Sequence, residues 1–531
     1  MARTPLFRRL QRAFALARLA EQRGEPETEL VERLAEARTT AFSRREVLAV
    51  GGFAAAGIAL GGRRIGAAPA APAVGEVAIV GAGVAGLTAA HRLVQAGVSA
   101  RIYEAQERVG GRMLSLRRAF PEGQVCELGG ELVDTNHTAL RGLCGELGLE
   151  LDDFTRDDPA VSRDVWYFDG RRIRDAEIVA AFRPIARQIE AAWAALSGED
   201  VTQASPNGGE TVDRQSIAEW LEKAGCSGWL YRLLEVGYVT EFGLEIDRQS
   251  AWNLLSMIST EPGAFEIFGE SDERFHIRGG NDQVPLRLAE GLGERIERGH
   301  RLEALTQRSD GRFELTFRTG ESSKVVAAER VVLALPFTLL RQVDLRIDLP
   351  EVKRRAITEL GMGTNAKVMV GFDDRLWRTR GRSNGSVLTD LPFQLSWEST
   401  RLQPGRGGIV VAYSGGLRGL EVGQGTPAEQ ARAFAREYDR LFPGVAAKRN
   451  TEARFHWPTH PWTLGSYACY LPGQWTGIRG AEGARVGALH FAGEHTSLDF
   501  QGYMEGGCES GERVAGEILT DLGRSKLPAG G

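Results

Sequence analysis

A glycine-rich turn between two predicted strands constrains the fold of this chain more than any other feature. Residues 76–80 form a short apolar run that suits a buried parallel strand. The pattern Gly-x-Gly-x-x-Gly follows at 81–86, and the helix predicted after it ends near Gly97. A second strand is predicted at 100–103, with Glu104 directly after it. This order predicts a strand–turn–helix–strand unit of a parallel α/β sheet.

The glycines of this turn indicate a bound dinucleotide. Gly81, Gly83 and Gly86 let the backbone approach a pyrophosphate at the N-terminus of the following helix. Glu104 lies 18 residues after Gly86, close to the spacing of about 20 at which an acid binds a ribose hydroxyl. Because the strand, helix and acid are all in register with the glycines, the segment predicts dinucleotide binding.

A glycine pair with an arginine follows six residues after that acid. Gly111 would allow a second close approach of the backbone to the same pyrophosphate. Arg112 would add a cation whose planar fork can bind phosphate oxygens in pairs. This extension resembles the flavoproteins of the amine oxidase and phytoene desaturase group more than the NAD dehydrogenases.

Composition excludes several other classes of protein. The chain has 531 residues, enough for about two to three domains. Its net charge of −5 argues against nucleic acid as the main partner. The five cysteines are sparse and form no CxxC pair, so we expect small buried core residues rather than disulfides. His456 and His460 have HxxxH spacing, but neighbouring prolines disfavour a shared helix, and we expect no metal site.

The N-terminal region, residues 1–73, resembles a bacterial twin-arginine export signal. Arg44 and Arg45 precede a weakly apolar run at 47–60, which is shorter than the roughly 17–25 residues of a membrane-spanning helix. Small-residue cleavage sites follow at 67–73. We expect the twin-arginine machinery as a partner and a periplasmic or extracellular location. A chance arginine pair before a core helix is the alternative, and the role of residues 1–42 stays open.

The C-terminal part carries the most specific resemblance. A predicted strand ends in Gly493 and Glu494, a loop follows, and a helix begins around Tyr503 and Met504. This resembles the C-terminal flavin signature of the flavin amine oxidases, which include monoamine oxidases, polyamine oxidases and L-amino acid oxidases. The resemblance covers about residues 75–520. Further segments match in the family's order: Gly129 and Gly130, residues 278–283, Arg301, residues 331–336, Lys367, Trp457 and Tyr467.

The resemblance implies a discontinuous domain organisation of the α/β class. It implies a Rossmann-like FAD-binding domain, with a doubly wound parallel sheet, and an α+β substrate domain with a mixed sheet and helices. Residues 213–260 are predicted to be mostly helical. The FAD-binding domain is assigned to 75–150, 270–345 and 455–520, the substrate domain to 151–269 and 346–454, and a tail to 521–531.

The family's reaction implies roles for three residues. Hydride passes from the amine-bearing carbon to flavin N5, the imine hydrolyses, and O2 reoxidises the flavin to give H2O2. Tyr467 and Tyr503 match two aromatic residues that form a slot for the amine, and Lys367 matches a lysine that holds a water near N5. Ser466 stands where monoamine oxidases have a cysteine bonded to the flavin, so we expect non-covalent FAD.

The substrate is less defined by the sequence. Leu132 stands where venom-type L-amino acid oxidases have an arginine that binds the substrate carboxylate. Glu131, Asp134 and Glu241 are candidates to hold a distant cationic group of a diamine, a polyamine or a basic amino acid. The alternative is that these are solvated surface acids, and Arg278 is an alternative carboxylate clamp.

Three other functions compete with an amine oxidase. A dehydrogenase that passes electrons to a quinone or cytochrome would have nearly the same sequence. An FAD-containing binding protein is disfavoured, because it needs none of Lys367, Tyr467 and Tyr503. The aromatic pair and the acidic pocket edge disfavour a lipid desaturase. A homodimer is common among relatives, but the sequence does not demonstrate one.

Overall fold

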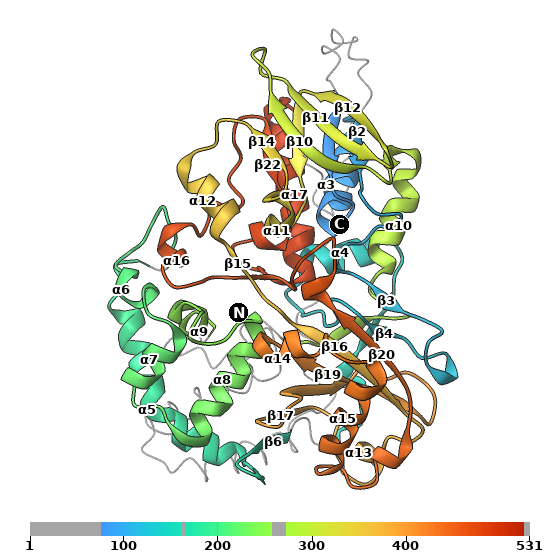
Figure 1. Ribbon diagram of the computed structural model, residues 1–531, viewed down its shortest axis with the longest axis vertical. Coiled ribbons are helices and arrows are strands. Elements are labelled where there is room, and N and C mark those ends of the chain that lie inside the picture. The colour runs from blue at the N-terminus through green and yellow to red at the C-terminus, as the bar shows by residue number, and fades with distance from the viewer. Residues whose placement is uncertain (1–75, 162–164, 199, 258–271, 525–531) are drawn as a thin grey trace, which may run out of the picture.

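Two large sheets, one parallel and one mixed, organise the molecule (Figure 1). The computed structural model describes residues 76–161, 165–198, 200–257 and 272–524. The predicted export signal, residues 1–73, and the tail beyond residue 524 lie outside the described residues. No helix in the described ranges is long and apolar enough to cross a membrane.

The parallel sheet has five strands in the order β22-β13-β1-β2-β9. All four neighbouring pairs run parallel. The predicted strand–turn–helix–strand unit is confirmed, since helix α3 (Val84–Gln95) joins the adjacent strands β1 and β2. The strands are β1 (Val77–Val80), β2 (Ala100–Tyr103), β9 (Ile296–Glu297), β13 (Arg330–Leu333) and β22 (Leu489–Phe491).

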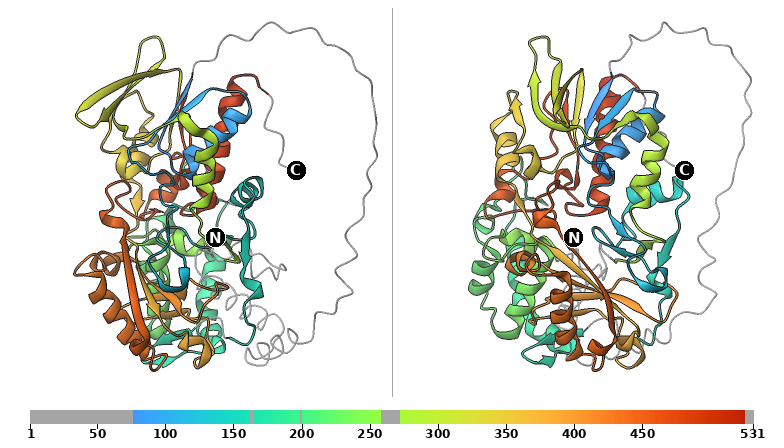
Figure 2. Two further views of the ribbon diagram at one scale, coloured as in Figure 1. Left: turned by 90° about the vertical axis from the view of Figure 1, so that its right-hand side faces the viewer. Right: turned by 45° about the vertical axis from the view of Figure 1, so that its right-hand side comes forward.

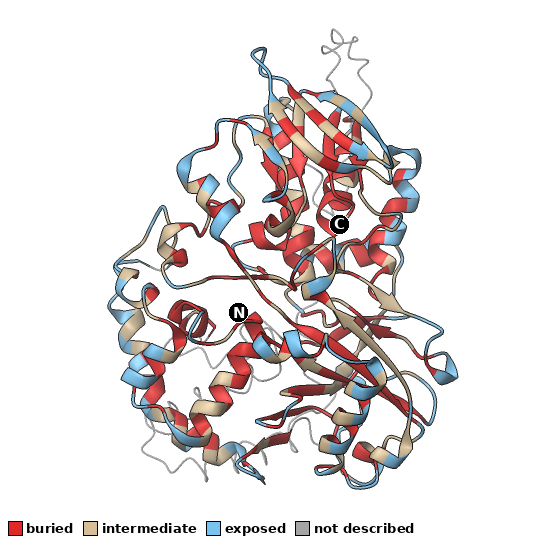
Figure 3. Ribbon diagram, in the orientation of Figure 1, coloured by how far each residue is buried: buried red, intermediate tan, exposed pale blue. Residues whose placement is uncertain are grey.

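The two faces of this sheet are covered differently. Val77 and Ile79 pack toward the helices α3, α10 (Gln283–Leu292) and α17 (Met504–Asp521), which lie together in the turned views of Figure 2. Ala78 and Val80 face the opposite side, because successive residues of a strand point to opposite faces. Helices α3 and α17 are buried along much of their length (Figure 3).

A second, four-stranded sheet, rather than a second layer of helices, covers that opposite face. The α/β class is confirmed, but the chain between β9 and β13 forms a meander where doubly wound folds place helices. The meander buries Leu305, Phe313 and Leu315 in the same core as Ala78 and Val80. Its strands are β10 (Arg301–Gln307), β11 (Phe313–Thr319), β12 (Ser322–Ala328) and the added β14 (Asp344–Arg346).

The second large sheet is mixed, as predicted, and has seven strands in the order β20-β16-β19-β18-β17-β6-β7. Only the β17–β6 pair is parallel. The strands are β20 (Arg449–His456), β16 (Ala366–Phe372), β19 (Gly408–Ser414), β18 (Leu395–Glu398), β17 (Val387–Thr389), β6 (Val165–Phe168) and β7 (Arg171–Arg172). Helix α15 (Pro427–Asp439) packs against this sheet.

Alternation along β16 decides which side chains face the inside of the molecule. Val368 and Val370 pack toward α15, in a core that includes Phe434. Met369 packs on the other side, against Leu128. Lys367 shares the face of Met369, since both have odd positions on one strand. The strand therefore presents the predicted lysine to the segment that carries Gly129 and Gly130.

Helix α8 (Gly228–Phe242) packs against β6, β17 and β19 of the mixed sheet, and the helical prediction for 213–260 is confirmed for its described part. A Ser216–Glu219 capping box begins α7, with each side chain bonded to the other residue's backbone N–H. All five cysteines are buried free thiols, which confirms their prediction as core residues. The helices are α5 (Asp175–Ala194), α6 (Glu210–Asp213), α7 (Ile217–Lys223), α8 (Gly228–Phe242) and α9 (Ala251–Leu255). The division into two domains at the stated boundaries stays a prediction.

Candidate functional site

One cavity of about 660 Å³ takes its walls from both large sheets. It brings together the predicted site residues except Gly86, which lies beneath the wall against Gly81, and the alternative clamp Arg278. The predicted residues on the wall are Gly81, Gly83, Glu104, Gly111, Arg112, Gly129, Gly130, Glu131, Asp134, Glu241, Arg301, Lys367, Trp457, Tyr467, Gly493, Glu494, Tyr503 and Met504.

The first glycine turn forms one end of this cavity. Gly81 follows β1 with a φ of +104°, which favours glycine. A Cβ at Gly86 would lie 2.1 Å from the carbonyl oxygen of Gly81, so this position has no room for a side chain. A Cβ at Gly83 would meet no protein atom within 4 Å, and Gly83 lines the cavity. The turn thus leaves open space at the N-terminus of α3, where a pyrophosphate fits.

Glu104 stands at the end of β2, beside this turn. Its Oε2 accepts a hydrogen bond from the Ala82 N–H at 2.7 Å, and its Oε1 accepts one from the Gln106 N–H at 2.8 Å. Burial raises the pKa of this carboxyl group above its ordinary value. Each carboxylate oxygen can accept more than one hydrogen bond, so the fixed group can still receive a ribose hydroxyl.

Arg112 and Glu494 join two distant segments in the middle of the cavity wall. The Arg112 Nη1 donates to Glu494 Oε1 at 2.7 Å and to the Ser466 carbonyl at 2.8 Å. Glu494 also accepts from the Gly502 N–H at 2.7 Å. Burial raises the pKa of Glu494, but the charge and hydrogen bond of Arg112, together with His495 and the Gly502 N–H, hold the pKa below the ordinary value. An ion pair without net charge, Arg112 with Glu494, therefore lies where phosphate or flavin atoms are expected.

Lys367 is bonded to the loop that contains the second glycine segment. Its Nζ donates to Glu131 Oε2 at 2.8 Å, to the Gly129 carbonyl at 2.8 Å and to the Glu127 carbonyl at 3.1 Å. These bonds account for the three donors of an ammonium group. Burial raises the pKa of Glu131, but Lys367 outweighs it and lowers the pKa overall. Glu131, predicted to hold substrate, is therefore already paired within the protein.

An aromatic wall faces the lysine. The hydroxyls of Tyr467 and Tyr413 lie 2.8 Å apart, and the Tyr467 hydroxyl donates to the Thr240 carbonyl at 3.2 Å. The ring of Trp397 lies 5.3 Å from that of Tyr413, and Lys367 Nζ lies 5.3 Å from the Trp397 ring centre. Tyr413 and Trp397 carry no sequence motif that predicts them as site residues. Tyr413 is placed at the site by strand register, because it lies opposite Lys367 where β19 pairs with β16.

Tyr503 lies beside a buried polar group that includes one of the predicted acids. Its ring is 5.2 Å from that of His137, whose Nε2 lies 3.3 Å from Asp134 Oδ2. Asp134 Oδ1 accepts from the Glu273 N–H at 2.5 Å. Burial lowers the pKa of His137 to about 3, so this imidazole is neutral. Asp134 is a fixed, buried acid rather than a solvated one.

Glu241 and Arg278 occupy contrasting positions. Glu241 is 1% exposed and comes from α8, so the interpretation as a solvated surface acid is wrong for it too. Arg278 does not line the cavity and pairs with Glu150 and Asp152 at the surface. It therefore cannot serve as a substrate clamp in this structure. Within the described ranges no group of three or more metal-binding side chains is found.

The chemistry of the cavity wall suits a non-covalent flavin dinucleotide. Glycine backbone, an acid after β2 and an arginine–glutamate pair follow one another along it. No cysteine among the described residues lines the cavity, and Ser466 does. Residues 84–519 match the family model of the flavin-containing amine oxidoreductases. The chain belongs to this family. The family uses FAD and acts on amines, so the chain is an FAD-dependent oxidoreductase of that class.

Relatives of this amine oxidoreductase are similar over most of its length. An L-amino acid dehydrogenase of Synechocystis sp. is 27% identical over 462 residues, which are 83% of this chain and 94% of that protein. Flavin-containing amine oxidase A of Canis lupus familiaris is 25% identical and covers 85% of this chain and 86% of its own.

Solved structures of similar proteins share the fold. Cyclohexylamine oxidase from Brevibacterium oxydans IH-35A has a TM-score of 0.74 at 24% identity, covering 85% of this chain and all of that one. Putrescine oxidase bound to putrescine has a TM-score of 0.71 at 22% identity, covering 84% and 99%. These likenesses show the fold alone.

Proposed function

We propose that this oxidoreductase oxidises an amine by hydride transfer from the amine-bearing carbon to flavin N5, with O2 as the electron acceptor. The products are an imine, which hydrolyses to a carbonyl compound and ammonia or an amine, and H2O2. The bound flavin supplies the hydride-accepting chemistry. The observation that carries the proposal is a single cavity that joins the glycine turn of α3 to the wall formed by Tyr413, Tyr467 and Trp397.

The side chains of this wall orient the amine. The linked hydroxyls of Tyr413 and Tyr467 fix the Tyr467 ring at the cavity surface. Aromatic faces attract a nitrogen centre that carries positive charge. Tyr503 approaches from the N-terminus of α17, and its contact with the neutral His137 ring limits its rotation. The aromatic residues thus exclude water and align the carbon that loses hydride.

The charges of the cavity favour an amine with a second cationic group. Asp134 and Glu241 are buried acids on the wall. The arginines on the wall are Arg112, which is paired with Glu494, and Arg301, at the start of β10. Arg301 follows His300, whose N–H donates to the Glu104 carbonyl, so Arg301 lies at the dinucleotide end. Acids on the wall with no arginine beside them at the amine end favour diamines and polyamines over neutral L-amino acids. Basic L-amino acids and simple monoamines are the other substrate classes in the proposal.

A dehydrogenase is the second candidate. A relative at 27% identity is named as an L-amino acid dehydrogenase. The same cavity would then reduce the flavin, and a quinone or cytochrome would take the electrons in place of O2. The identity of the acceptor separates the two candidates.

We also propose export by the twin-arginine route to the periplasm or the exterior, on the basis of Arg44, Arg45 and the small-residue sites at 67–73. We also propose a homodimer, because homodimers are common among relatives. Replacing both arginines by lysine should leave the protein in the cytoplasm of a bacterial host, with unprocessed length on a gel. If that variant is still cleaved and exported, the proposal of twin-arginine export is contradicted.

The test of function uses the holoenzyme and a panel of monoamines, diamines, polyamines and the twenty L-amino acids. We expect O2 uptake and stoichiometric H2O2 with at least one amine. Activity that is highest on a dication and falls in Asp134→Asn or Glu241→Gln supports the acidic pocket. Flavin reduction by an amine without O2 uptake, followed by reoxidation with a quinone, supports the dehydrogenase instead.

A further inference from the structure

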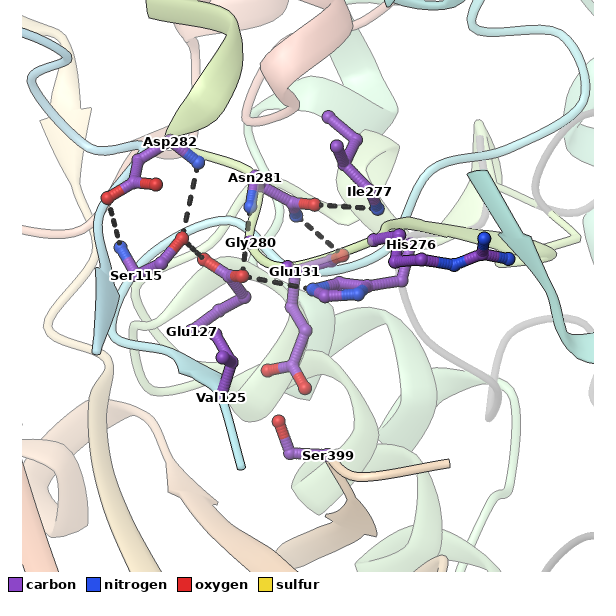
Figure 4. Close-up of polar contacts among 12 residues, drawn as sticks. Ser115, Val125, Glu127, Glu131, His276, Ile277, Gly280, Asn281, Asp282 and Ser399 are labelled. Atoms are coloured by element: carbon purple, nitrogen blue, oxygen red, sulfur yellow. Dashed lines mark hydrogen bonds and ion pairs between the residues drawn. The ribbon is translucent and has the colours of Figure 1, made fainter. Parts of the chain in front are cut away.

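A fully buried carboxylate lies behind the loop that Lys367 contacts. Glu127, at the end of β4 (Cys126–Glu127), has no exposed surface. Its Oε2 accepts from the Ser115 hydroxyl at 2.7 Å, and its Oε1 accepts from the Asn281 N–H at 3.0 Å. His276 Nε2 lies 2.9 Å from the same Oε1 (Figure 4). Glu127 thus has a polar partner on three different segments of the chain.

His276 is the charged partner of this carboxylate. It lies on β8 (Phe275–Ile277), which pairs with β5 (Leu151–Asp153), and it is almost completely buried. Burial alone lowers the pKa of the imidazole, but the hydrogen bond and charge of Glu127 outweigh it and raise the pKa above its ordinary value. Glu131 and Asp152 act in the same direction. The acids that surround His276 therefore favour its protonated form.

The loop between Glu127 and Glu131 is fixed from two sides. Lys367 holds the carbonyls of Glu127 and Gly129 together with the Glu131 carboxylate. From the other side, the Asn281 Nδ2 donates to the Gly130 carbonyl at 3.0 Å and to the Glu131 carbonyl at 2.8 Å. Glycine is required within the loop, since a Cβ at Gly129 would lie 1.8 Å from the Arg112 carbonyl oxygen.

Two acids and two bases therefore meet at one segment of the cavity wall: Glu131 and Lys367 on the wall, and Glu127 and His276 behind it. Removing four such groups from water costs free energy, and buried pairs often add little net stability. A buried charged network is worth retaining where it fixes a single geometry. Gly129, Gly130 and Glu131 line the cavity, whereas Glu127 and His276 do not. The pair is therefore placed to act on the cavity through the loop.

We propose that Glu127 and His276 are positioning residues, which hold the Gly129–Glu131 loop and, through Glu131, the Lys367 ammonium in place against the flavin. The proposal rests on the proposed function, because it assigns the pair to the same reaction. His276 does not touch the cavity, so its effect is on the geometry of residues that do. The flavin then serves as a reporter of that geometry.

The test replaces His276 in the holoenzyme by leucine and by glutamine. Leucine removes the hydrogen bond to Glu127, whereas the glutamine amide can still donate one from nearly the same position. We expect His276→Leu to lower kcat by about ten- to a hundredfold, the order of a small misplacement of reacting groups, with little change in KM. The visible spectrum and midpoint potential of the flavin should shift as well. His276→Gln should restore most of each property.

His490 provides the matched control. It is a fully buried histidine, its Nδ1 lies 2.7 Å from Glu517, and neither residue lines the cavity. His490→Leu should lower thermal stability to a similar extent and leave the flavin spectrum and potential unchanged. Equal spectral changes in both leucine variants, or none in either, would overturn the proposal.

Two further arms keep the test decisive. If His276→Leu does not fold, Glu127→Leu removes the acceptor of the same hydrogen bond and should give the same spectral shift. If no amine reduces the wild-type flavin, the proposed function fails. The spectrum and potential of the His276 variants still report the loop geometry in that case, so the two failures are distinguishable.

Discussion

The two ends of the cavity are built from different parts of the chain. At the dinucleotide end the wall is mainly backbone: Gly81 and Gly83 leave space, and Glu104 is held by N–H groups of the same local unit. At the amine end the wall is side chains, and Lys367 and Tyr467 depend on partners more than 200 positions away. The dinucleotide end therefore cannot accept an added side chain, whereas the amine end cannot lose one partner of a buried ion pair.

Removing the lysine should have the largest effect at the amine end. Lys367→Met leaves the buried Glu131 without its cation, and breaking a buried pair in this way costs about 3–5 kcal/mol. We expect a large drop in apparent Tm and in the rate of flavin reduction. Lys367→Met combined with Glu131→Gln should recover stability but not rate, which would separate the pairing from the chemistry.

Lys353 is the control for this substitution. It is equally buried, its Nζ donates to the Glu482 carbonyl, and it does not line the cavity. Burial lowers the pKa of Lys353 to about 7, so this lysine is partly neutral in the folded protein. Lys353→Met should cost less stability than Lys367→Met and leave the rate of flavin reduction unchanged. A slower rate in both variants would mean that the amine end responds to general loss of stability.

Adding one methyl group should have the next largest effect, at the dinucleotide end. Gly86→Ala forces a Cβ against the Gly81 carbonyl oxygen, and such overpacking costs about 1–3 kcal/mol. We expect poor folding and loss of FAD on purification. The added methyl group of Gly83→Ala meets no protein atom, so this variant should fold normally. Its affinity for FAD should nevertheless be reduced, because the methyl group enters the cavity.

A third alanine calibrates this pair. Gly142 lies within α4 (Thr138–Glu146), and a Cβ there would also meet no atom within 4 Å. Gly142→Ala should be neutral or stabilising by a few tenths to about 1 kcal/mol, since alanine favours helix over the unfolded chain. FAD titrations of the three apoproteins, followed by flavin fluorescence, measure the differences. Normal FAD affinity in Gly83→Ala would contradict the assignment of the glycine turn at 81–86 to pyrophosphate binding.

The tyrosine pair should show a smaller, graded effect. Tyr467→Phe loses contacts to Tyr413 and to the Thr240 carbonyl, whereas Tyr413→Phe loses its contact to Tyr467. Neutral hydrogen bonds contribute about 0.5–1.5 kcal/mol each, so we expect kcat/KM to fall by roughly three- to tenfold per bond. Tyr438→Phe, on the buried face of α15, loses a hydrogen bond to the Gly385 carbonyl and should leave kcat/KM unchanged.

The smallest expected effect is a pH dependence of stability from His276. Its pKa is raised in the folded protein, so its contribution is fully present below the ordinary value of about 6.5. That contribution is lost as the pH rises through the folded-state pKa. The Tm difference between wild type and His276→Gln should therefore be larger at pH 6 than at pH 9. A difference that grows with pH would show that Glu127, Glu131 and Asp152 do not hold the imidazole charged.

The same contrast explains which features the sequence could predict. The β1–α3–β2 unit depends on neighbouring residues, so the glycine spacing and Glu104 predict it directly. The sequence alone predicts Glu131 as a substrate-binding acid, because no local pattern shows that β16 brings Lys367 to it. Tyr413 has no motif of its own, and only the register of β16 with β19 places it at the site. The meander between β9 and β13 likewise replaces helices through tertiary packing.

The central claim, a flavin reduced by an amine in the cavity walled by Tyr413 and Tyr467, has one direct test. The holoenzyme is mixed without oxygen with each amine of the panel, and the flavin absorbance is followed in a stopped-flow instrument. We expect at least one amine to bleach the flavin in a concentration-dependent reaction that slows in Tyr467→Phe. If no amine bleaches the wild-type flavin although chemical reduction does, the claim is contradicted.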